Sequence, residues 1–546
     1  MGKKMEKYFA DINLLIIFDK ILTAMSRFID YGNLDFRSVI NSDFVDKSGL
    51  INVLNERIDT RNKFLCISRP RRFGKSLAAQ MLYAYYDRSC DSRELFNGLE
   101  ITKSPDFEKH LNKYPTIYLD WNRFASESKT TVVRDAQKAI IADLKESYDF
   151  LTEKEQLITA LEEINVKTGD RFIFIIDEWD KLVREVDKHT QEEYVNFLRA
   201  MFKSNSANKI FLLVYMTGIL PIIKVEAQSA LNNFDEFSII RPVNTAQYYG
   251  FTKAEVATLC DKYGLELELM EHAYDGYIIG KEKSMFNPNS VIMAIEDGEY
   301  KSHWSKTASY TTIEHYIKND IDGLRDKIVK MLNGEKVKIN VSSFRNDMKN
   351  IETCDDVLTL LTHLGYLSYD PVFSRVMIPN TEVAEEFENS IRVCGWGTLS
   401  KAIGKSRELL DATISGDKKY VEQALDSYHD EATSFIEFND ENSLACAIRL
   451  AYYSAQAQYE IFREFPSGKG FADMVFVPVK NSPYPAVVVE LKYDKTAQGA
   501  IAQIKNKNYQ GKLQNFSKTI ILLGINYDKV TKKHEVELES LNGDFV

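Results

Sequence analysis

The sequence is poor in cysteine and has no close cysteine pair. Its 546 residues include six cysteines, which stand singly at positions 66, 90, 260, 354, 394 and 446. Close pairs of the C-x-x-C kind are typical of zinc sites, and dense cysteine patterns are typical of disulfide-stabilised secreted domains. Their absence argues against a structural zinc site and favours a cytoplasmic protein.

Long apolar runs are missing as well, and so is a positive net charge. A membrane-spanning helix takes about 20 apolar residues, and no such run occurs, so no membrane contact is expected. The apolar run at 14–18 lies between Asp11 and Asp19 with no small-residue cleavage site after it, which argues against a signal peptide. Met25 is an alternative start. The net charge of −11 restricts any nucleic-acid contact to a local patch.

The length predicts several domains, about three or four, because one hydrophobic core does not grow to this size. Apolar strands alternate with helices between residues 61 and 243, which predicts a doubly wound α/β sheet. A helical stretch is expected at 130–163. Strands are expected at 64–67, 115–120, 171–177 and 209–217.

A phosphate-binding loop is predicted between the strand at 64–67 and a helix at 77–86. A strand, a loop, Gly-Lys-Ser and a helix form the layout of a P-loop. Lys75 would supply a positive charge to the β- and γ-phosphates of ATP, and the hydroxyl of Ser76 would bind Mg²⁺. The residues expected to hold the nucleotide are Arg69, Pro70, Arg71, Arg72, Phe73, Gly74, Lys75, Ser76 and Leu77.

The start of this loop departs from the general motif. Arg69, followed by Pro70, stands where the first glycine is usual, so the loop needs its own backbone path, because arginine adopts a positive φ reluctantly. The alternative is a basic turn before a helix. Arg69, Arg71, Arg72 and Arg241 all stay open as arginine fingers.

A second motif completes the expected nucleotide site. The apolar strand at 171–177 ends in Asp177 and Glu178, which is a Walker B pattern. Asp177 would hold Mg²⁺, and Glu178 would polarise the attacking water. The alternative is a strand end with solvated acids.

The C-terminal region holds a separate set of chemically active residues. Strands are expected at 471–477, 485–493 and 518–526, with a helix at 497–509 before the last, in the order β-β-α-β. Asp473 lies on the first strand and Glu490 and Lys492 on the second, where their spacing of two residues puts both on one face. Two carboxylates can hold a divalent metal, and the lysine can orient water or stabilise a phosphodiester transition state.

A run of lysines follows this site. From 492 to 518 the chain has six lysines (492, 495, 505, 507, 512 and 518) and one acid, Asp494. Such a face could contact phosphates. The alternative is a solvated helix C-terminus.

The stretch Arg-Pro-Arg-Arg-Phe-Gly-Lys-Ser at 69–76, with Asp473 and Glu490-x-Lys492, resembles bacterial AAA-ATPase-like proteins that carry a C-terminal PD-(D/E)XK nuclease superfamily domain. The resemblance implies a γ-phosphate-sensing role for Thr217, although a threonine closing a strand is an equal alternative. It also implies that Gln503 supports the nuclease site and that Glu441, which opens a helix expected at 441–459, contributes an acid.

The chain has Gly470-Phe471-Ala472-Asp473 where that family usually places an arginine before the acid, which puts substrate contact in doubt. A helix ending at Gly365 before two short strands predicts a winged helix. Its acids, Glu382, Glu385, Glu386 and Glu388, favour a spacer over a DNA-binding role.

The expected architecture is α/β: a P-loop NTPase of AAA-like fold, a helical lid, a winged-helix-like segment and a C-terminal α/β restriction-endonuclease-like domain. The expected parts are a helical extension (1–34), the AAA-like ATPase (35–245), the helical lid (246–312), the winged-helix-like segment (313–390), a helical connector (391–435) and the nuclease-like domain (436–546).

Two functions remain open from the sequence. The first is an ATP-binding and ATP-hydrolysing protein coupled to a Mg²⁺-dependent nuclease that acts on nucleic acid, with DNA placed before RNA. The second is an ATP-dependent switch or scaffold that binds nucleic acid or protein through an inactive nuclease-like domain. The sequence leaves the state of assembly open, including a homo-oligomer.

Overall fold

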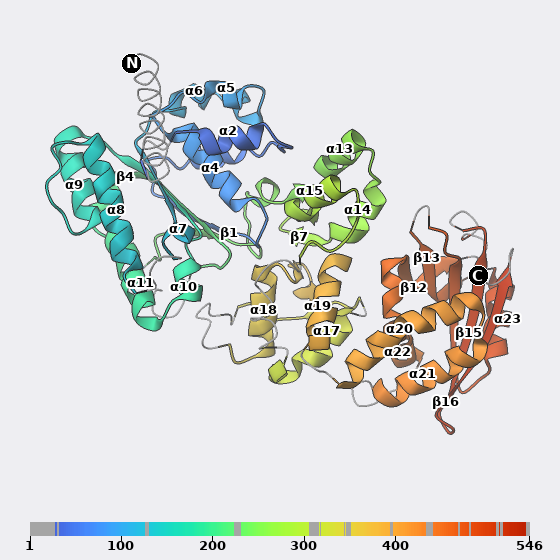
Figure 1. Cartoon of the computed structure of the whole chain (residues 1–546). Coiled ribbons are helices and arrows are strands. Elements are labelled where there is room, and N and C mark those ends of the chain that lie inside the picture. The colour runs from blue at the N-terminus through green and yellow to red at the C-terminus, as the bar shows by residue number, and fades with distance from the viewer. Residues whose placement is uncertain are drawn as a thin grey trace, which may run out of the picture.

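The structure is a computed structural model of the chain. It describes residues 28–29, 32–125, 130–222, 231–304, 316, 318–332, 334–342, 344, 351–393, 397–432, 441–467, 470–479, 482–508, 513 and 517–541. In this part of the chain no helix is both long enough and apolar enough to cross a membrane. Figure 1 shows the parts following one another in chain order, from a parallel sheet with its helices to a second sheet at the C-terminal end.

The first part is a five-stranded parallel sheet in the order β2-β3-β4-β1-β5. Its central strands are apolar and fully buried, as expected for a parallel sheet covered on both faces. Two hydrophobic clusters lie on its opposite faces. The four strands predicted from sequence are therefore present, and β4 lies between the P-loop strand β1 and the Walker B strand β3.

The strands of this part are β1 (Phe64–Ser68), β2 (Thr116–Asp120), β3 (Phe172–Asp177), β4 (Phe211–Gly218) and β5 (Asp235–Phe237). Its helices are α2 (Leu34–Ile40), α3 (Leu50–Asn55), α4 (Lys75–Tyr86), α5 (Arg93–Phe96), η1 (Glu100–Lys103), α6 (Phe107–His110), α7 (Trp121–Ala125), α8 (Val132–Ser147), α9 (Leu157–Thr168), α10 (Lys181–Glu185), α11 (Lys188–Phe202) and α12 (Ala207–Ile210).

The helical stretch expected at 130–163 is wrong in one respect, since it is two helices, α8 and α9. The break follows Ser147, and Tyr148 and Leu151 in the connection are both buried. An apolar anchor in a connection continues the apolar pattern of the helices around it, which is why the sequence pattern did not show the break.

The lid is less helical than expected. Helix α13 begins with the capping box of Thr252 and Glu255. The hairpin of β7 and β8, joined through Gly280, pairs with β6 in a three-stranded antiparallel sheet that the sequence analysis missed. The elements are η2 (Ala246–Tyr248), β6 (Phe251–Thr252), α13 (Lys253–Tyr263), α14 (Leu267–Tyr274), β7 (Tyr277–Ile279), β8 (Glu282–Phe286) and α15 (Pro288–Asp297).

The next segment contains the expected helix and strands of a winged helix. Helix α18 ends at Gly365, whose φ of 94° is left-handed, and the antiparallel strands β10 and β11 follow. Strand β9 pairs with β11 and completes a three-stranded sheet. The elements are η3 (Ile321–Gly323), α17 (Leu324–Leu332), β9 (Val337–Lys338), α18 (Cys354–Leu364), β10 (Ser368–Asp370), β11 (Arg375–Met377) and α19 (Thr381–Val393).

The C-terminal part is a five-stranded mixed sheet in the order β12-β13-β14-β15-β16. The predicted β-β-α-β order is confirmed by β13, β14, α23 and β15. Strands β14 and β15 pair in parallel. The elements are α20 (Gly397–Ser415), α21 (Lys418–Ala432), α22 (Glu441–Ala451), η4 (Tyr453–Ala457), β12 (Tyr459–Ser467), β13 (Gly470–Pro478), β14 (Ala486–Tyr493), α23 (Ala497–Lys507), β15 (Ile520–Asp528) and β16 (Lys533–Leu541).

The helix expected at 441–459 is wrong beyond Ala451, because the chain turns there and enters β12 at Tyr459. Helix α21 lies directly on the sheet. The ring of His429 stacks on that of Tyr527, with 4.4 Å between the ring centroids, and the backbone N–H of Val536 donates a hydrogen bond to Glu422. Residues expected to form a connector thus cover one face of the C-terminal sheet.

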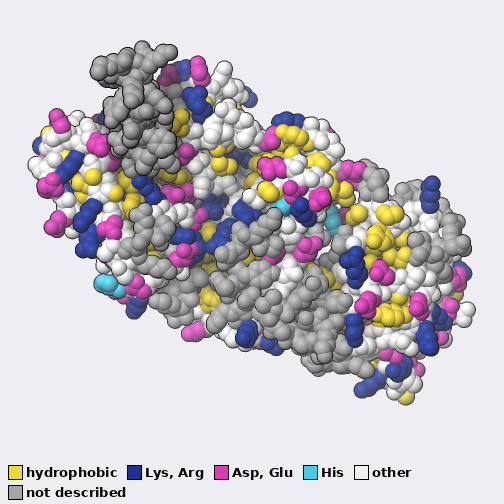
Figure 2. All heavy atoms as spheres, in the orientation of Figure 1, with side chains coloured by type: hydrophobic (Ala, Val, Ile, Leu, Met, Phe, Trp, Pro, Cys, Tyr) yellow, Lys and Arg dark blue, Asp and Glu magenta, His cyan; other side chains and the backbone are white. Residues whose placement is uncertain are grey.

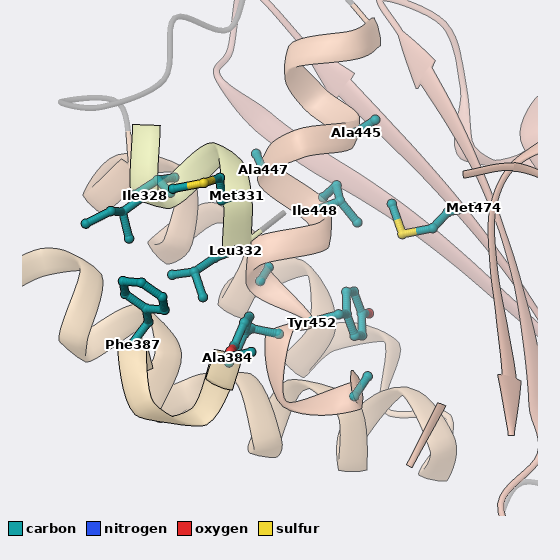
Figure 3. Packing of buried hydrophobic residues seen from close by; sticks show 14 of the residues in the cluster. Ile328, Met331, Leu332, Ala384, Phe387, Ala445, Ala447, Ile448, Tyr452 and Met474 are labelled. Atoms are coloured by element: carbon teal, nitrogen blue, oxygen red, sulfur yellow. The ribbon is translucent and has the colours of Figure 1, made fainter. Parts of the chain in front are cut away.

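The winged-helix-like segment and the C-terminal sheet share one hydrophobic core. Leu332 of α17 and Phe387 of α19 belong to the same cluster as Ile448 of α22 and Met474 of β13. Figure 3 shows these side chains meeting between the helices and the sheet. Burying apolar surface on both sides makes relative movement costly, so the two parts are expected to move as one body.

Two of the four acids expected to mark the winged-helix-like segment as a spacer are not on its surface. Glu382 and Glu386 are each 2% exposed. Glu382 accepts hydrogen bonds from the backbone N–H of His303 and the hydroxyl of Ser290, both in the lid region. Burial raises the pKa of Glu382 to about 7, against the opposing effects of these two donors. These acids fasten the segment to the lid.

Glu382→Gln is expected to flatten the dependence of stability on pH. The folded-state pKa is about 7 against an ordinary 4.5, so folding binds a proton and the free energy of unfolding falls as pH rises through that interval. One pKa unit is worth about 1.4 kcal/mol, so the largest expected difference between the two proteins is about 3 kcal/mol. Urea unfolding at pH 5 and pH 8 measures it, with Glu94→Gln as the exposed control. An equal pH slope in wild type and Glu382→Gln would contradict the prediction.

Candidate functional site

The P-loop follows β1 and leads into α4, and its backbone is unusual at two places. Gly74 has a φ of 82° and caps α4, and a Cβ there would meet nothing within 4 Å. The residue with a positive φ among the loop arginines is Arg72, at 66°, while Arg69 adopts ordinary backbone angles. The loop therefore follows its own path, as expected, and the strain falls on Arg72 rather than on the first glycine position.

A cavity of about 1130 Å³ opens at the P-loop. Its walls come from the loop and the start of α4, from the residues that follow β3, and from the lid. The charged and hydroxyl side chains that line this cavity include Arg71, Lys75, Ser76, Glu178, Lys181 and Arg184. A cavity of this size at a helix N-terminus suits a phosphate-bearing ligand.

Lys75 lies at the base of the cavity, and its side chain is nearly enclosed. Its Nζ donates to the carbonyl of Pro70 at 2.9 Å. Burial lowers the pKa of Lys75, and the carboxylates of Glu178 and Asp177 oppose that shift. A buried lysine close to two acids keeps its charge for an anion that enters the cavity.

Several predicted nucleotide residues do not line the cavity: Arg69, Pro70, Asp177 and Thr217. Arg69 is fully buried and donates to the carbonyls of Phe237 and Thr245, so its side chain holds the loop onto β5 and the segment after it. The hydroxyl of Thr217 donates to the carbonyl of Ile67 at 2.9 Å across β4 and β1. In this arrangement both side chains brace the sheet.

The two Walker B acids occupy different surroundings. Asp177 is 1% exposed, and burial raises its pKa while the hydroxyl of Ser76 lowers it. Glu178 lies at the cavity wall with a left-handed φ of 51°. Burial raises the pKa of Glu178, and Lys75 and Arg184 lower it. Asp177 therefore lies beside Ser76, and Glu178 faces the cavity.

The sequence analysis missed Arg184 and Lys181. Both lie on α10, immediately after the Walker B strand, and both line the cavity. Arg184 makes ion pairs with Glu178 at 3.1 Å and with Asp180 at 2.9 Å. Arg184 follows Glu178 by six residues and lies on the short helix α10, and this spacing was the signal in the sequence that could have identified it.

The C-terminal site brings its four predicted residues together. The backbone N–H of Leu491 donates to Asp473 Oδ2 at 2.7 Å, which joins β13 to the strand that carries Glu490. The Nζ of Lys492 donates to Glu490 Oε1 at 3.0 Å. Gln503, from α23, donates its amide N–H to the same oxygen. Three elements therefore converge on Glu490.

Glu490 is electrostatically unusual. It is 1% exposed, and burial together with the charge of Asp473 raises its pKa to about 7, although Lys492 lowers it. Its Oε2 is buried and has no hydrogen-bond partner in the described structure. A buried carboxylate oxygen left without a donor, next to a second acid, fits a divalent cation.

The donor sets of both sites are small. Within the described residues no group of three or more His, Cys, Asp and Glu side chains is placed to hold a metal ion. Mg²⁺ commonly binds one or two carboxylates and takes its other ligands from waters and substrate phosphates. Ser76 with Asp177, and Asp473 with Glu490, fit that pattern.

The basic face is smaller than expected. Lys505 pairs with Glu539 and Lys492 with Glu490, and Lys512 lies outside the described residues. Figure 2 shows acidic and basic side chains interspersed over the face in view.

Glu441 begins α22, and its side chain also lies outside the described part of the chain. Arg241 is exposed, and nothing ranks it above the other arginines as a finger.

Two family models match the chain. One, described as a predicted AAA-ATPase, matches residues 30–227, and the other, described as the PD-(D/E)XK nuclease superfamily, matches residues 439–537. The first covers the P-loop and both Walker B acids, and the second covers Asp473, Glu490, Lys492 and Gln503. Among curated proteins none matches the chain.

Solved structures give distant likenesses. A Walker-type ATPase of Pyrococcus abyssi is 12% identical, with a TM-score of 0.31 over 62% of this chain and 94% of that one. The Aeropyrum pernix ORC2 protein, in ADPNP and ADP complexes, is 12% identical, with a TM-score of 0.32 over 65% and 98%. The Aeropyrum pernix ORC1 protein in complex with DNA is 11% identical, with a TM-score of 0.26 over 64% and 94%. TM-scores this low allow no inference about the function of this chain.

Proposed function

We propose that this chain, which carries a predicted AAA-ATPase domain and a PD-(D/E)XK nuclease superfamily domain, hydrolyses ATP and couples that reaction to Mg²⁺-dependent cleavage of nucleic acid. The observation that carries the proposal is the convergence of Asp473, Glu490 and Lys492 at one point of the C-terminal sheet. Solvated strand-end acids would not converge in this way, nor would a carboxylate oxygen such as Glu490 Oε2 be buried without a hydrogen-bond donor among the described residues.

At the first site the residues divide the work. Lys75 and the N-terminus of α4 bind the phosphates, and Ser76 with Asp177 would hold Mg²⁺, which would neutralise phosphate charge. Glu178 accepts the proton of the attacking water. Leu364 and Phe251 add apolar surface to the cavity wall.

At the second site Asp473 and Glu490 would hold Mg²⁺, which would polarise the phosphodiester and acidify a water. Lys492 places a positive charge beside them, where negative charge develops on the phosphate oxygens. Gln503 fixes the orientation of Glu490 through the hydrogen bond that its side-chain amide donates to Oε1. We place DNA before RNA as the substrate, with the nucleic acid reaching Asp473 and Glu490 on the neighbouring inner strands β13 and β14.

A structural route joins the two sites. The end of α18 touches the P-loop, because a Cβ on Gly365 would lie 2.7 Å from Pro70. Tyr277 of the lid donates to the carbonyl of Gly365 at 2.8 Å. The winged-helix-like segment then shares its core with the C-terminal sheet. A change at the loop thus reaches the nuclease domain through packed contacts.

The test is a cleavage assay on single- and double-stranded DNA and RNA, with and without ATP, in Mg²⁺ and in Mn²⁺. Wild type is expected to cut at least one substrate, and the rate is expected to depend on ATP. Lack of cleavage under every condition would overturn the nuclease proposal and leave an ATP-dependent switch that binds without cutting.

Metal binding has its own expected result. Asp473→Ala and Glu490→Ala are each expected to remove Mn²⁺ binding to the full chain when no nucleotide is added, because the site depends on two converging carboxylates. Titration calorimetry measures it, and omitting nucleotide keeps the metal of the first site out of the signal. Asp494→Asn, an exposed acid close by on the chain, is the matched control. Unchanged Mn²⁺ binding in both alanine variants would refute the metal assignment.

A further inference from the structure

Arg184 holds the glutamate that is proposed to activate water. Its Nη2 lies 3.1 Å from Oε2 of Glu178, and its Nε lies 2.9 Å from Oδ2 of Asp180. The side chains of Arg184 and Asp180 are only 9% and 0% exposed. Charge-assisted hydrogen bonds are about twice as strong as neutral ones. In this arrangement Glu178 is directed at the guanidinium of Arg184.

The two carboxylates that bind Arg184 are not equally fixed. Asp180 also accepts hydrogen bonds from the backbone N–H groups of Ile219 and Leu220, each at 3.1 Å. Glu178 is 17% exposed, and among the described residues its carboxylate forms an ion pair with Arg184. Asp180 therefore anchors Arg184, and the pair with Glu178 is the one that can be exchanged.

Arg184 lies among like charges that face one cavity. Burial lowers the pKa of Arg71, and repulsion by Arg184 lowers it further. The same two causes lower the pKa of Lys75, where the nearby acids oppose them. Cations this close in a partly buried cavity favour an anion between them. A phosphate with more than one negative charge is the ligand that relieves both repulsions, of Arg184 with Arg71 and of Arg184 with Lys75.

We propose that Arg184 is a positioning residue that exchanges its ion pair with Glu178 for the terminal phosphate of ATP. The inference rests on the proposed ATPase function. When Arg184 bonds to that phosphate, Glu178 loses its cation partner and is released to accept the proton of the attacking water. The water oxygen then bonds to phosphorus as the bridging P–O bond breaks. Arg184 keeps all its protons throughout. ADP lacks the terminal phosphate and leaves the pair in place.

The experiment measures the affinity of the full chain for ADP and for a non-hydrolysable ATP analogue by calorimetry. Arg184→Ala is expected to weaken the analogue about tenfold to a hundredfold, the value of a charged hydrogen bond. Its affinity for ADP is expected to stay within about twofold, since Lys75 and the loop are unchanged. Arg184→Lys is expected to restore part of the analogue affinity, because lysine binds phosphate as a point charge. Arg199→Ala, an exposed arginine on α11, is the matched control.

The outcomes separate the inference from the function beneath it. If wild type binds neither nucleotide, the proposed ATPase function fails. If wild type binds both and Arg184→Ala keeps the wild-type ratio of analogue to ADP affinity, only the role of Arg184 fails. Because Arg184→Ala leaves Asp180 buried without its cation, melting temperatures are measured first. Should it not fold, Arg184→Gln, which keeps an N–H for Asp180 without the charge, carries the same test and the same expected loss.

Discussion

Lys492→Ala is expected to eliminate cleavage while leaving nucleic-acid affinity nearly unchanged. The Nζ of Lys492 lies 3.0 Å from Glu490 Oε1, and its side chain is 12% exposed, so its charge is aimed at the metal site rather than at solvent. Such a group acts on charge that appears in the transition state, and its loss costs a rate factor of about 10²–10³. Nucleic-acid affinity loses one phosphate contact at most, which changes the slope of log affinity against log salt concentration by about one unit.

The measurement pairs affinity with cleavage on one labelled duplex and one labelled single strand at fixed salt. Lys495→Ala removes the same charge from an exposed position three residues along the chain and is expected to retain wild-type cleavage. Equal rates in Lys492→Ala and Lys495→Ala would show that Lys492 serves binding alone.

The parts that sequence predicted best are those in which local pattern and function coincide. A buried apolar strand followed by Gly-Lys-Ser specifies β1, the loop and α4 with little help from the rest of the chain. The same is true of Asp473, Glu490 and Lys492, whose alternation along β13 and β14 fixes the face on which they lie. Strand order could not be predicted in this way, because it depends on which strands are brought together by long crossovers.

The features that sequence missed depend on contacts between distant segments. Glu382 and Glu386 read as surface acids, and their burial follows from the lid, which supplies His303 and Ser290 as partners of Glu382 and Ser302 as the partner of Glu386. Strand β12 was not predicted: the helix was expected to run to Tyr459, where pairing with β13 makes the chain a strand. Arg69 and Thr217 looked like nucleotide residues, and hydrogen bonds to carbonyls of neighbouring strands engage both.

Lys75→Ala and Glu178→Gln are expected to separate ATP binding from hydrolysis. Lys75→Ala removes the lysine of the loop from the base of the cavity, and no ATP binding is expected, with affinity at least about a hundredfold below wild type. Glu178→Gln keeps that charge and loses the proton acceptor, so hydrolysis is expected to fall by about 10²–10⁴ while binding is retained.

Glu178→Gln also breaks the ion pair that holds Arg184, since a neutral amide offers that guanidinium no charge. If Arg184 exchanges Glu178 for phosphate, this variant should bind the ATP analogue at least as tightly as wild type, because no ion pair has to be given up. Calorimetry with the analogue and phosphate release with ATP give the two numbers, and melting temperatures check that the buried Lys75 site still folds. Wild-type ATP affinity in Lys75→Ala would sink the P-loop assignment. Hydrolysis at the wild-type rate in Glu178→Gln would instead remove Glu178 from the reaction and leave the P-loop in place.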